Sequence, residues 1–171
     1  YAADEVAIAN ALGQELERHR ETRDVALFYR PHPRQQAARI TSLKQTGRVI
    51  LDTNWRGGWS LNPADISWIK TICQGALMTV SAFSTVVLEA ALCGTPSVLI
   101  GFGDSAHGTG KALDHAQYEH MAEMMHKPGV WLASAFLDLM PLISPLATVG
   151  VSDRACIRRW ALEIAAVDLD P

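Results

Sequence analysis

A serine-threonine pair followed by a single glutamate is the strongest chemical signal in the chain. Ser84 and Thr85 follow an apolar, strand-like run and begin a predicted helix over Ser84–Leu92, in which Glu89 is the only charged residue. The amino end of a helix carries unpaired N–H groups and a partial positive charge, and both attract an anion such as a phosphate. The pair therefore predicts a phosphate-binding turn.

Glu89 is the residue that could extend this site beyond a phosphate. The predicted helix is apolar nearly all round, so we expect it to be buried, and a buried carboxylate is costly without hydrogen-bond partners. At a rise of ~1.5 Å per residue, Glu89 lies roughly 6–8 Å from the helix mouth, which matches the reach from a pyrophosphate to a ribose. A carboxylate can accept bonds from both ribose hydroxyls. Alternatively, Ser84 only caps the helix, and Glu89 pairs with a buried arginine or a backbone N–H group.

A histidine held between two prolines is the second candidate. His32 comes just after the predicted strand Val25–Arg30. In open α/β sheets the ligand crevice lies outside the carboxyl ends of the strands, which places His32 near Ser84. Fixed by its neighbours, His32 would lose little entropy on binding, and it could contact a phosphate or assist the leaving group as an acid. The alternative is a loop histidine bonded to the backbone, with Arg30 and Arg34 as either phosphate clamps or surface charges.

Short apolar runs alternate with longer helical patterns, which is typical of a parallel sheet covered by helices. The predicted strands are Val25–Arg30, Val49–Asp52, Leu77–Ser81, Ser97–Gly101 and Gly129–Ala133. The predicted helices are residues 3–19, Pro33–Leu43, Asn62–Gln74, Ser84–Leu92, Ala116–Met125, Ala135–Ile143 and Ser152–Val167. We expect a single domain over residues 1–171, a three-layer α/β/α sandwich with a mostly parallel, Rossmann-like sheet. Because a doubly wound sheet normally begins with a strand and this chain begins with a helix, we expect its first strand to be missing.

Composition and charge argue against several classes of protein. The 171 residues are 49% hydrophobic and 19% charged with a net charge of −3, which suits one compact domain and not a disordered chain. No Lys/Arg cluster indicates a nucleic-acid partner, and the longest apolar stretch, Ala76–Phe102, is too interrupted for a transmembrane segment. Three cysteines without a C-x-x-C pair predict reduced, buried thiols in a cytoplasmic protein, and neither disulfides nor a zinc site.

The segment that carries Ser84, Thr85 and Glu89 resembles the donor-binding helix of GT-B glycosyltransferases. The similarity continues through the helix to the stop at Gly94-Thr95-Pro96, and it extends to sugar-nucleotide 2-epimerases and CDP-glycerol glycerophosphotransferases. In those families the Ser/Thr turn binds the donor diphosphate and the helix glutamate binds the ribose. The resemblance therefore implies phosphate binding by Ser84 and Thr85 and ribose binding by Glu89.

A second segment, Arg30-Pro31-His32-Pro33, is similar to one in the same bacterial surface-polymer enzymes. The family's roles carry over only to Ser84, Thr85 and Glu89, so His32 as the catalytic residue and Arg30 as a further phosphate contact are predicted from their position after the strand. A weaker similarity at Tyr118–Met121 adds His120 as a donor or acceptor contact, and the whole resemblance spans most of Arg23–Leu142. It implies that the chain is the C-terminal, donor-binding half of a GT-B enzyme without its N-terminal acceptor domain, so that this half would bind donor without turnover.

The remaining candidates carry weaker signals. Trp55 could stack on a base or an acceptor, or cover a domain interface. Gly103 belongs to a G-x-G-x-x-A run over residues 101–106, but later glycines would break the helix that a dinucleotide motif requires. This loop could contact the donor or be a plain surface loop. No two histidines have helical i, i+3 or i+4 spacing, so no metal is expected, although a mixed His120/Glu123 pair stays open.

The sequence thus predicts transfer of a glycosyl or glycerophosphate group from a nucleotide-activated donor to a surface polysaccharide or polyol-phosphate acceptor. The donor would be a nucleotide-diphosphate sugar or a CDP-polyol, and no cofactor is expected. Two alternatives stay open. The chain could be one half of a non-hydrolysing UDP-sugar 2-epimerase, or it could be a non-catalytic nucleotide-binding α/β module. The full-length enzyme would be cytoplasmic, with a peripheral position at the inner face of the plasma membrane.

Overall fold

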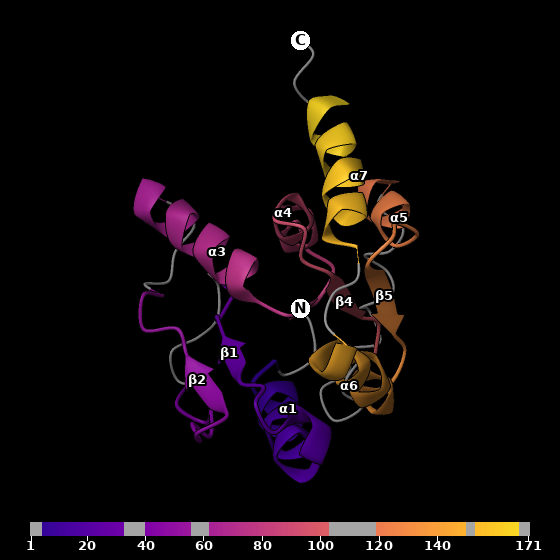
Figure 1. Cartoon of the computed structure of the whole chain (residues 1–171). Coiled ribbons are helices and arrows are strands. Elements are labelled where there is room, and N and C mark those ends of the chain that lie inside the picture. Colours follow the sequence, from indigo (N-terminus) through magenta and orange to yellow (C-terminus); the bar gives the residue numbers. More distant parts are fainter. Residues whose placement is uncertain (1–4, 33–39, 56–61, 103–118, 150–152, 168–171) are drawn as a thin grey trace.

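The computed structural model describes residues 5–32, 40–55, 62–102, 119–149 and 153–167 (Figure 1). This part of the chain is a mixed α/β structure. Its helices are α1 (Glu5–Arg18), α3 (Pro63–Gly75), α4 (Val86–Leu92), α5 (Glu119–Met124), α6 (Leu139–Val149) and α7 (Arg154–Val167). Its strands are β1 (Leu27–Tyr29), β2 (Val49–Leu51), β3 (Thr79–Ser81), β4 (Ser97–Ile100) and β5 (Val130–Ala133), with 3₁₀ turns η1 (Arg20–Thr22) and η3 (Phe136–Asp138).

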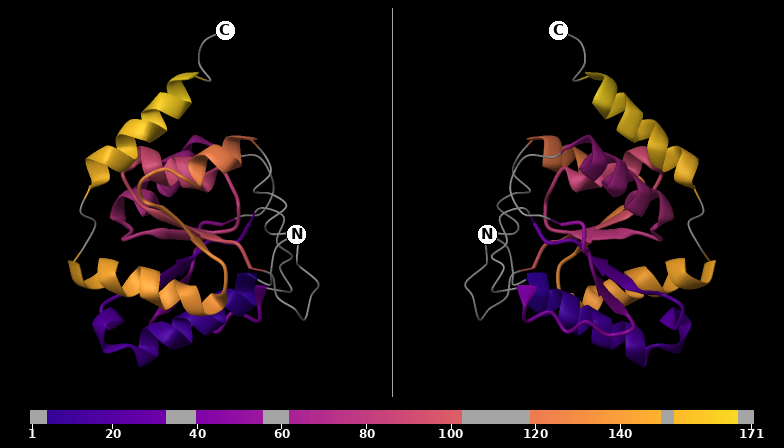
Figure 2. Two further views of the ribbon diagram at one scale, coloured as in Figure 1. Left: turned by 90° about the vertical axis from the view of Figure 1, so that its right-hand side faces the viewer. Right: turned by 90° about the vertical axis from the view of Figure 1, so that its left-hand side faces the viewer.

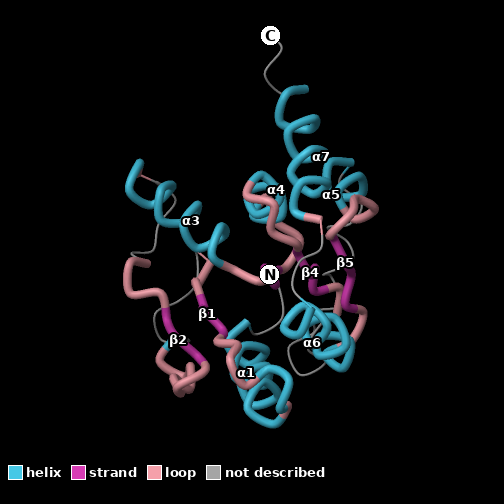
Figure 3. The backbone as a smooth tube through the Cα atoms, viewed as in Figure 1, coloured by secondary structure: helices cyan, strands magenta, loops and turns pink. Residues whose placement is uncertain are grey.

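The strands form two small parallel sheets. β1 pairs with β2, so that Phe28 lies opposite Ile50, and β3, β4 and β5 form the second sheet in that order. Figure 3 shows the two groups of strands apart along the backbone, with β1 and β2 at the left and β4 and β5 at the right. The prediction of parallel strands is confirmed, but the described residues do not join them into one sheet, because β1 and β3 are not paired.

Helix α3 connects the two sheets. Its first turn lies at the carboxyl end of the first sheet, where Asp65 Oδ1 is 3.8 Å from Arg30 Nη2. Its last turn lies at the amino end of the second sheet, where the Cys73 carbonyl accepts a 2.5 Å hydrogen bond from Thr95 Oγ1, just before β4. A helix that begins at the carboxyl end of one sheet and ends at the amino end of the next is typical of a connection between parallel strands.

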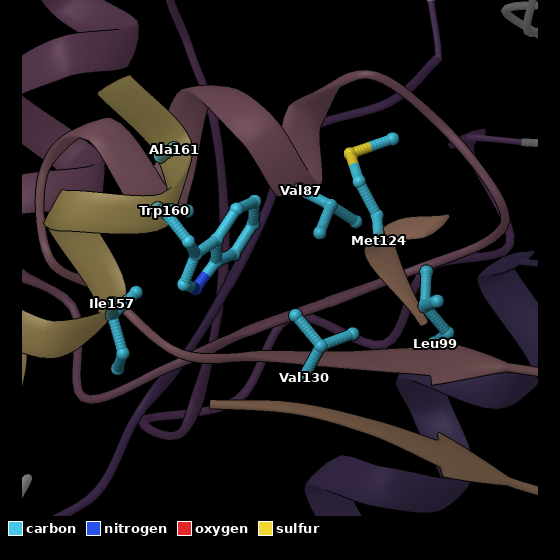
Figure 4. Packing of buried hydrophobic residues seen from close by; sticks show 8 residues of the cluster. Val87, Leu99, Met124, Val130, Ile157, Trp160 and Ala161 are labelled. Carbon is cyan, nitrogen blue, oxygen red and sulfur yellow. The ribbon is translucent and has the colours of Figure 1, made fainter. Parts of the chain in front are cut away.

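Helices lie on both sides of the strands (Figure 2). Helices α1 and α6 lie on one side, and α3, α4, α5 and α7 lie on the other. On the α1 side, one buried cluster joins Leu12, Leu16, Val98, Ala133, Leu139, Met140 and Ile143. On the other side, α7 packs across α4, β4 and β5 through a second cluster (Figure 4). None of the helices in these described ranges has the length and apolar character that crossing a bilayer requires.

Two helix ends are determined by residues close to them in the sequence. Asn62 Oδ1 accepts a 3.0 Å bond from the Asp65 N–H group, and Asp65 Oδ2 accepts one from the Asn62 N–H group at 3.3 Å, which forms a capping box at the predicted start of α3. The predicted stop after α4 is also confirmed. Gly94 has φ +74°, and a Cβ there would lie 2.9 Å from the Arg154 carbonyl oxygen, so this position requires glycine.

Other predicted elements differ mainly at their ends. β1 and β3 are shorter than predicted, and the helix predicted over Ala135–Ile143 begins as η3 and continues as α6 to Val149. η3 forms there because Asp138 Oδ2 accepts 2.8 Å bonds from the N–H groups of Ser134 and Ala135. Most of the predicted helix Pro33–Leu43 and the first residues of Ala116–Met125 lie outside the described residues.

The three cysteines are free, but they are not equally buried. Cys73 is buried, and burial raises the pKa of its thiol to about 11, with smaller contributions from the neighbouring Cys93 and Glu89. Cys93 and Cys156 are partly exposed. The prediction of buried thiols is therefore correct for Cys73 and wrong for the other two. Cys93 follows the last residue of α4 and Cys156 lies in the first turns of α7, where the side chains are only partly covered.

Candidate functional site

The carboxyl end of the first sheet meets α3 and α4 at a group of charged residues. Arg30 follows β1, Asp52 follows β2, Asp65 lies in the first turn of α3, and Glu89 lies in α4. We call these four residues the charged cluster. Arg30 forms an ion pair with Asp52, lies 3.8 Å from Asp65, and exerts its positive charge on Glu89. Arg30 thus pairs with carboxyl groups from two different elements, and its positive charge acts to lower the pKa of a third, that of Glu89.

Asp52 is the most firmly held member of the charged cluster. Its side chain is 0% exposed, and it accepts hydrogen bonds from Arg30, from Trp68 Nε1 at 3.1 Å and from the Asn54 N–H group at 2.9 Å. These bonds offset the cost of burying the carboxylate, and they fix the Arg30 side chain in place. Asp52 was not among the site residues predicted from the sequence. The available signal was an aspartate directly after an apolar strand, at the end where open α/β sheets bind ligands.

Arg30, the predicted phosphate contact, therefore has carboxylate partners already. Its side chain is 24% exposed, so only part of it is open to a ligand. The charges of Asp52 and Asp65 offset that of the guanidinium, which weakens its attraction for a further anion. Carboxylates, by contrast, accept hydrogen bonds from hydroxyl groups. The charged cluster is thus better suited to a hydroxyl-rich ligand than to a bare phosphate.

The first N–H groups of α4 are already hydrogen-bonded within the turn that precedes this helix. The Val86 N–H group donates to Ser84 Oγ at 3.4 Å, the Val87 N–H group to the Ser84 carbonyl at 3.2 Å, and the Leu88 N–H group to the Thr85 carbonyl at 2.9 Å. We expected free N–H groups here, and this expectation is wrong at these three positions, because the turn closes on itself. Binding of an anion at this turn would depend more on the Ser84 and Thr85 hydroxyls than on backbone N–H groups.

Glu89 is exposed to solvent, so the expectation of a buried carboxylate is also wrong. Val87, Ala90 and Ala91 are buried in the same helix, because α7 and the second sheet cover only that side of α4. Thr85 is exposed as well, and residues four apart share one face of a helix, so Thr85 and Glu89 lie on the same open face. Partial desolvation still raises the pKa of the Glu89 carboxyl group, while the positive charge of Arg30 acts in the opposite direction.

This raised pKa predicts a specific pH dependence for the Glu89→Gln variant. A carboxyl group with a raised pKa in the folded state keeps its proton to a higher pH there than in the unfolded chain. Ionisation of Glu89 therefore destabilises the fold as the pH rises above 4.5, the ordinary pKa of a glutamate. Because glutamine stays uncharged, we expect Glu89→Gln to lose less stability than the wild type over that rise. Urea unfolding between about pH 4 and about pH 7 measures the difference.

The matched control is Glu17→Gln, which changes an exposed glutamate of α1 on the other side of the strands. Its free energy of unfolding should follow the wild-type curve over the same pH range. If the Glu89→Gln and wild-type curves are parallel, Glu89 is not desolvated in the folded chain.

The other predicted site residues fall in different places. His32 is partly buried at the same end of β1 as Arg30, and the structure therefore brings it to the same sheet edge. Trp55 is partly buried, and its backbone N–H group donates to the Asp52 carbonyl at 3.3 Å. Gly103, Arg34 and the 103–110 loop lie outside the described residues, as does the side chain of His120.

Two buried polar atoms near these strand ends have no hydrogen-bond partner within the described structure. They are Trp55 Nε1, after β2, and Ser81 Oγ, at the end of β3. Across the described ranges, no group of three or more His, Cys, Asp or Glu side chains is arranged to hold a metal ion. The His120/Glu123 pair stays untested, because the His120 side chain is not described.

Comparison of the chain with protein-family models, with curated proteins and with solved structures finds no match. The features of this chain that point to a function are the charged cluster and the turn before α4.

Proposed function

We propose that the chain is the donor-binding half of a GT-B-like transferase, built as a Rossmann-like, three-layer α/β domain. The observation that supports this best is the open face of α4, where Thr85 and Glu89 are exposed together and Arg30 exerts its charge on Glu89. A hydroxyl, a carboxylate and a cation at the carboxyl ends of parallel strands suit a ligand that carries both hydroxyl groups and phosphates.

In this proposal each residue has one role toward a nucleotide-activated donor. Glu89 accepts hydrogen bonds from the ribose hydroxyls, and Ser84 and Thr85 donate from their hydroxyls to the diphosphate. Arg30 approaches the phosphate from its exposed side, and His32 contacts it from the end of β1. The ligand would be a nucleotide-diphosphate sugar or a CDP-polyol, and the acceptor would be a surface polysaccharide or a polyol phosphate.

The proposed reaction displaces a nucleoside diphosphate or CMP as the acceptor hydroxyl attacks the donor. Negative charge grows on the leaving phosphate, and fixed hydroxyl donors together with Arg30 would stabilise it electrostatically. His32 would give a proton to the leaving phosphate as a general acid. Because the N–H groups of Val86, Val87 and Leu88 are bonded within the turn, these side chains carry more of that role than the helix terminus does.

Titration calorimetry of the chain with UDP, CDP and CMP tests the proposal. We expect at least one of them to bind, and we expect Glu89→Ala to weaken that binding about 10- to 100-fold, because hydrogen bonds to a charged group are lost. Glu17→Ala, on the other side of the strands, is the control and should bind like the wild type. Absence of binding by all three nucleotides, or wild-type binding by Glu89→Ala, would contradict the donor site.

A further inference from the structure

Two of the three cysteines lie where α3 packs against α4. Cys93 directly follows α4, and its Sγ–H group donates a weak hydrogen bond of 3.9 Å to the Lys70 carbonyl of α3. Just beyond it, Thr95 Oγ1 donates to the Cys73 carbonyl at 2.5 Å. These two contacts join neighbouring parts of the same two segments, and Cys73 and Cys93 each contribute to one of them. The contacts therefore place the two cysteines next to each other.

The direction of helix side chains brings the two sulfur atoms to the same turn of α3. Side chains lean toward the N-terminus of their helix and lie over the preceding turn. Cys73 therefore leans back over the turn of Lys70, whose carbonyl the Cys93 sulfur contacts. The effect of Cys93 on the pKa of the Cys73 thiol agrees with this placement. Cysteines placed in this way can form a disulfide with little movement of the backbone.

The two thiols differ in their access to solvent and in their reactivity. Cys93 is partly exposed, whereas Cys73 is only 3% exposed. Burial raises the pKa of the Cys73 thiol to about 11, so very little of it is thiolate near neutral pH. Because the thiolate is the form that attacks a disulfide, an oxidant in solution should react first at Cys93. Cys73 is then the neighbouring thiol that can displace what Cys93 has bound.

We propose that Cys93 and Cys73 are a redox-active pair, which a small disulfide such as oxidised glutathione converts to a disulfide bond between α3 and α4. The Cys93 thiolate first attacks one sulfur of oxidised glutathione and releases one glutathione thiolate. Cys73 then loses its proton to water, and its sulfur attacks the Cys93 sulfur and releases the second glutathione thiolate. Overall, two protein thiols lose two electrons and two protons, and the small disulfide is reduced to two thiols.

The intermediate of this reaction would stand beside the proposed donor site. Cys93 follows Glu89 by four residues and has helical backbone angles, so it continues the face of α4 that carries Thr85 and Glu89. Glutathione attached to Cys93 is bulky and negatively charged, and it would repel a nucleotide phosphate. Formation of the Cys73–Cys93 bond releases it and reopens this face. The effect on nucleotide binding rests on the proposed function, whereas formation of the bond does not.

Mass spectrometry after incubation with oxidised glutathione tests the pair. The chain used is Cys156→Ser, which removes the other partly exposed thiol. We expect the folded chain to lose two hydrogens and retain no glutathione, and peptide mapping should join Cys73 to Cys93. With Cys73→Ala added, the chain should retain one glutathione on Cys93. With Cys93→Ser added instead, it should retain none, because Cys73 is buried. Dithiothreitol should reverse each change.

Two outcomes on the Cys156→Ser chain would overturn the pair, and neither depends on how the other variants fold. One is glutathione that stays on Cys93 although Cys73 is present. The other is a disulfide that forms only in urea or only between two copies of the chain. In either case the folded chain does not hold the two thiols together.

Calorimetry with UDP, CDP and CMP tests the effect on the donor site separately. The Cys73→Ala, Cys156→Ser chain with glutathione on Cys93 should bind nucleotide about tenfold more weakly than the same chain after reduction, because the attached negative charge repels the ligand. Equal binding by the two forms would overturn the effect on the donor site and leave the disulfide intact. No binding by the reduced chain would instead contradict the proposed function, while the mass measurement would still decide the pair.

Discussion

Replacing Asp52 with alanine should lower the free energy of unfolding by about 3–5 kcal/mol, since breaking a buried ion pair leaves a charge without its partner. The Asp52 side chain is 0% exposed and accepts bonds from Arg30, Trp68 and the Asn54 N–H group. Alanine would leave the Arg30 guanidinium and the indole N–H group short of an acceptor. Urea unfolding followed by fluorescence and circular dichroism measures the change.

Two further variants separate the charge from the packing around it. Asp65→Asn is the matched control, because Asp65 lies 3.8 Å from Arg30 and asparagine keeps a side-chain oxygen that can still accept from the Asn62 N–H group of the capping box, so we expect a loss of about 1 kcal/mol or less. The double variant Arg30→Met with Asp52→Leu removes both charges, and we expect it to be much more stable than Asp52→Ala. If Asp52→Ala costs no more than Asp65→Asn, the Arg30–Asp52 pair is not buried in solution.

The Arg30–Asp52 pair also affects how binding experiments on this site must be designed. A neutral substitution of Arg30 leaves Asp52 buried without its ion-pair partner, so a loss of nucleotide binding by such a variant would mix unfolding with a lost contact. Glu89 does not have this problem, because it is exposed and makes its proposed contacts outside the core. For this reason Glu89→Ala, rather than a change at Arg30, tests the donor site.

The sequence predicted the elements that local signals control. The Asn62-Pro63-Ala64-Asp65 run contains the whole capping box of α3, and Gly94 supplies the left-handed residue that ends α4. These predictions succeed because all the interacting groups lie within a few residues of one another. The order of helices and short strands follows from the same local alternation of apolar runs.

The charged cluster could not be predicted in this way. Arg30 and Asp52 are 22 residues apart, and they meet only because β1 and β2 pair in parallel with Tyr29 opposite Leu51. Glu89 was expected to be buried because its helix is apolar nearly all round, but that pattern does not show which side is covered. The cover comes from α7, whose residues follow α4 by more than sixty positions.

Trp160 is the residue through which α7 covers α4, and Trp160→Ala should lower the free energy of unfolding by about 3–5 kcal/mol. Its side chain is 5% exposed and lies in the same buried cluster as Val87, Leu99 and Val130 (Figure 4). Its indole N–H group also donates to the Pro128 carbonyl at 3.0 Å. Alanine would leave a large cavity between α7, α4 and the second sheet, and it would remove this hydrogen bond.

Trp160→Phe separates these two contributions, because it keeps an aromatic ring in the cluster and removes the N–H donor. We expect it to cost about 0.5–1.5 kcal/mol, since one partly buried hydrogen bond is lost and Pro128 is exposed to water. Leu162→Ala is the control on the same helix, because Leu162 is 52% exposed and should contribute little. If Trp160→Ala is no more destabilising than Leu162→Ala, α7 does not cover α4 in solution. The part of α4 that α7 covers would then be open as well, and the exposure of Thr85 and Glu89 would no longer single out their face as the ligand side.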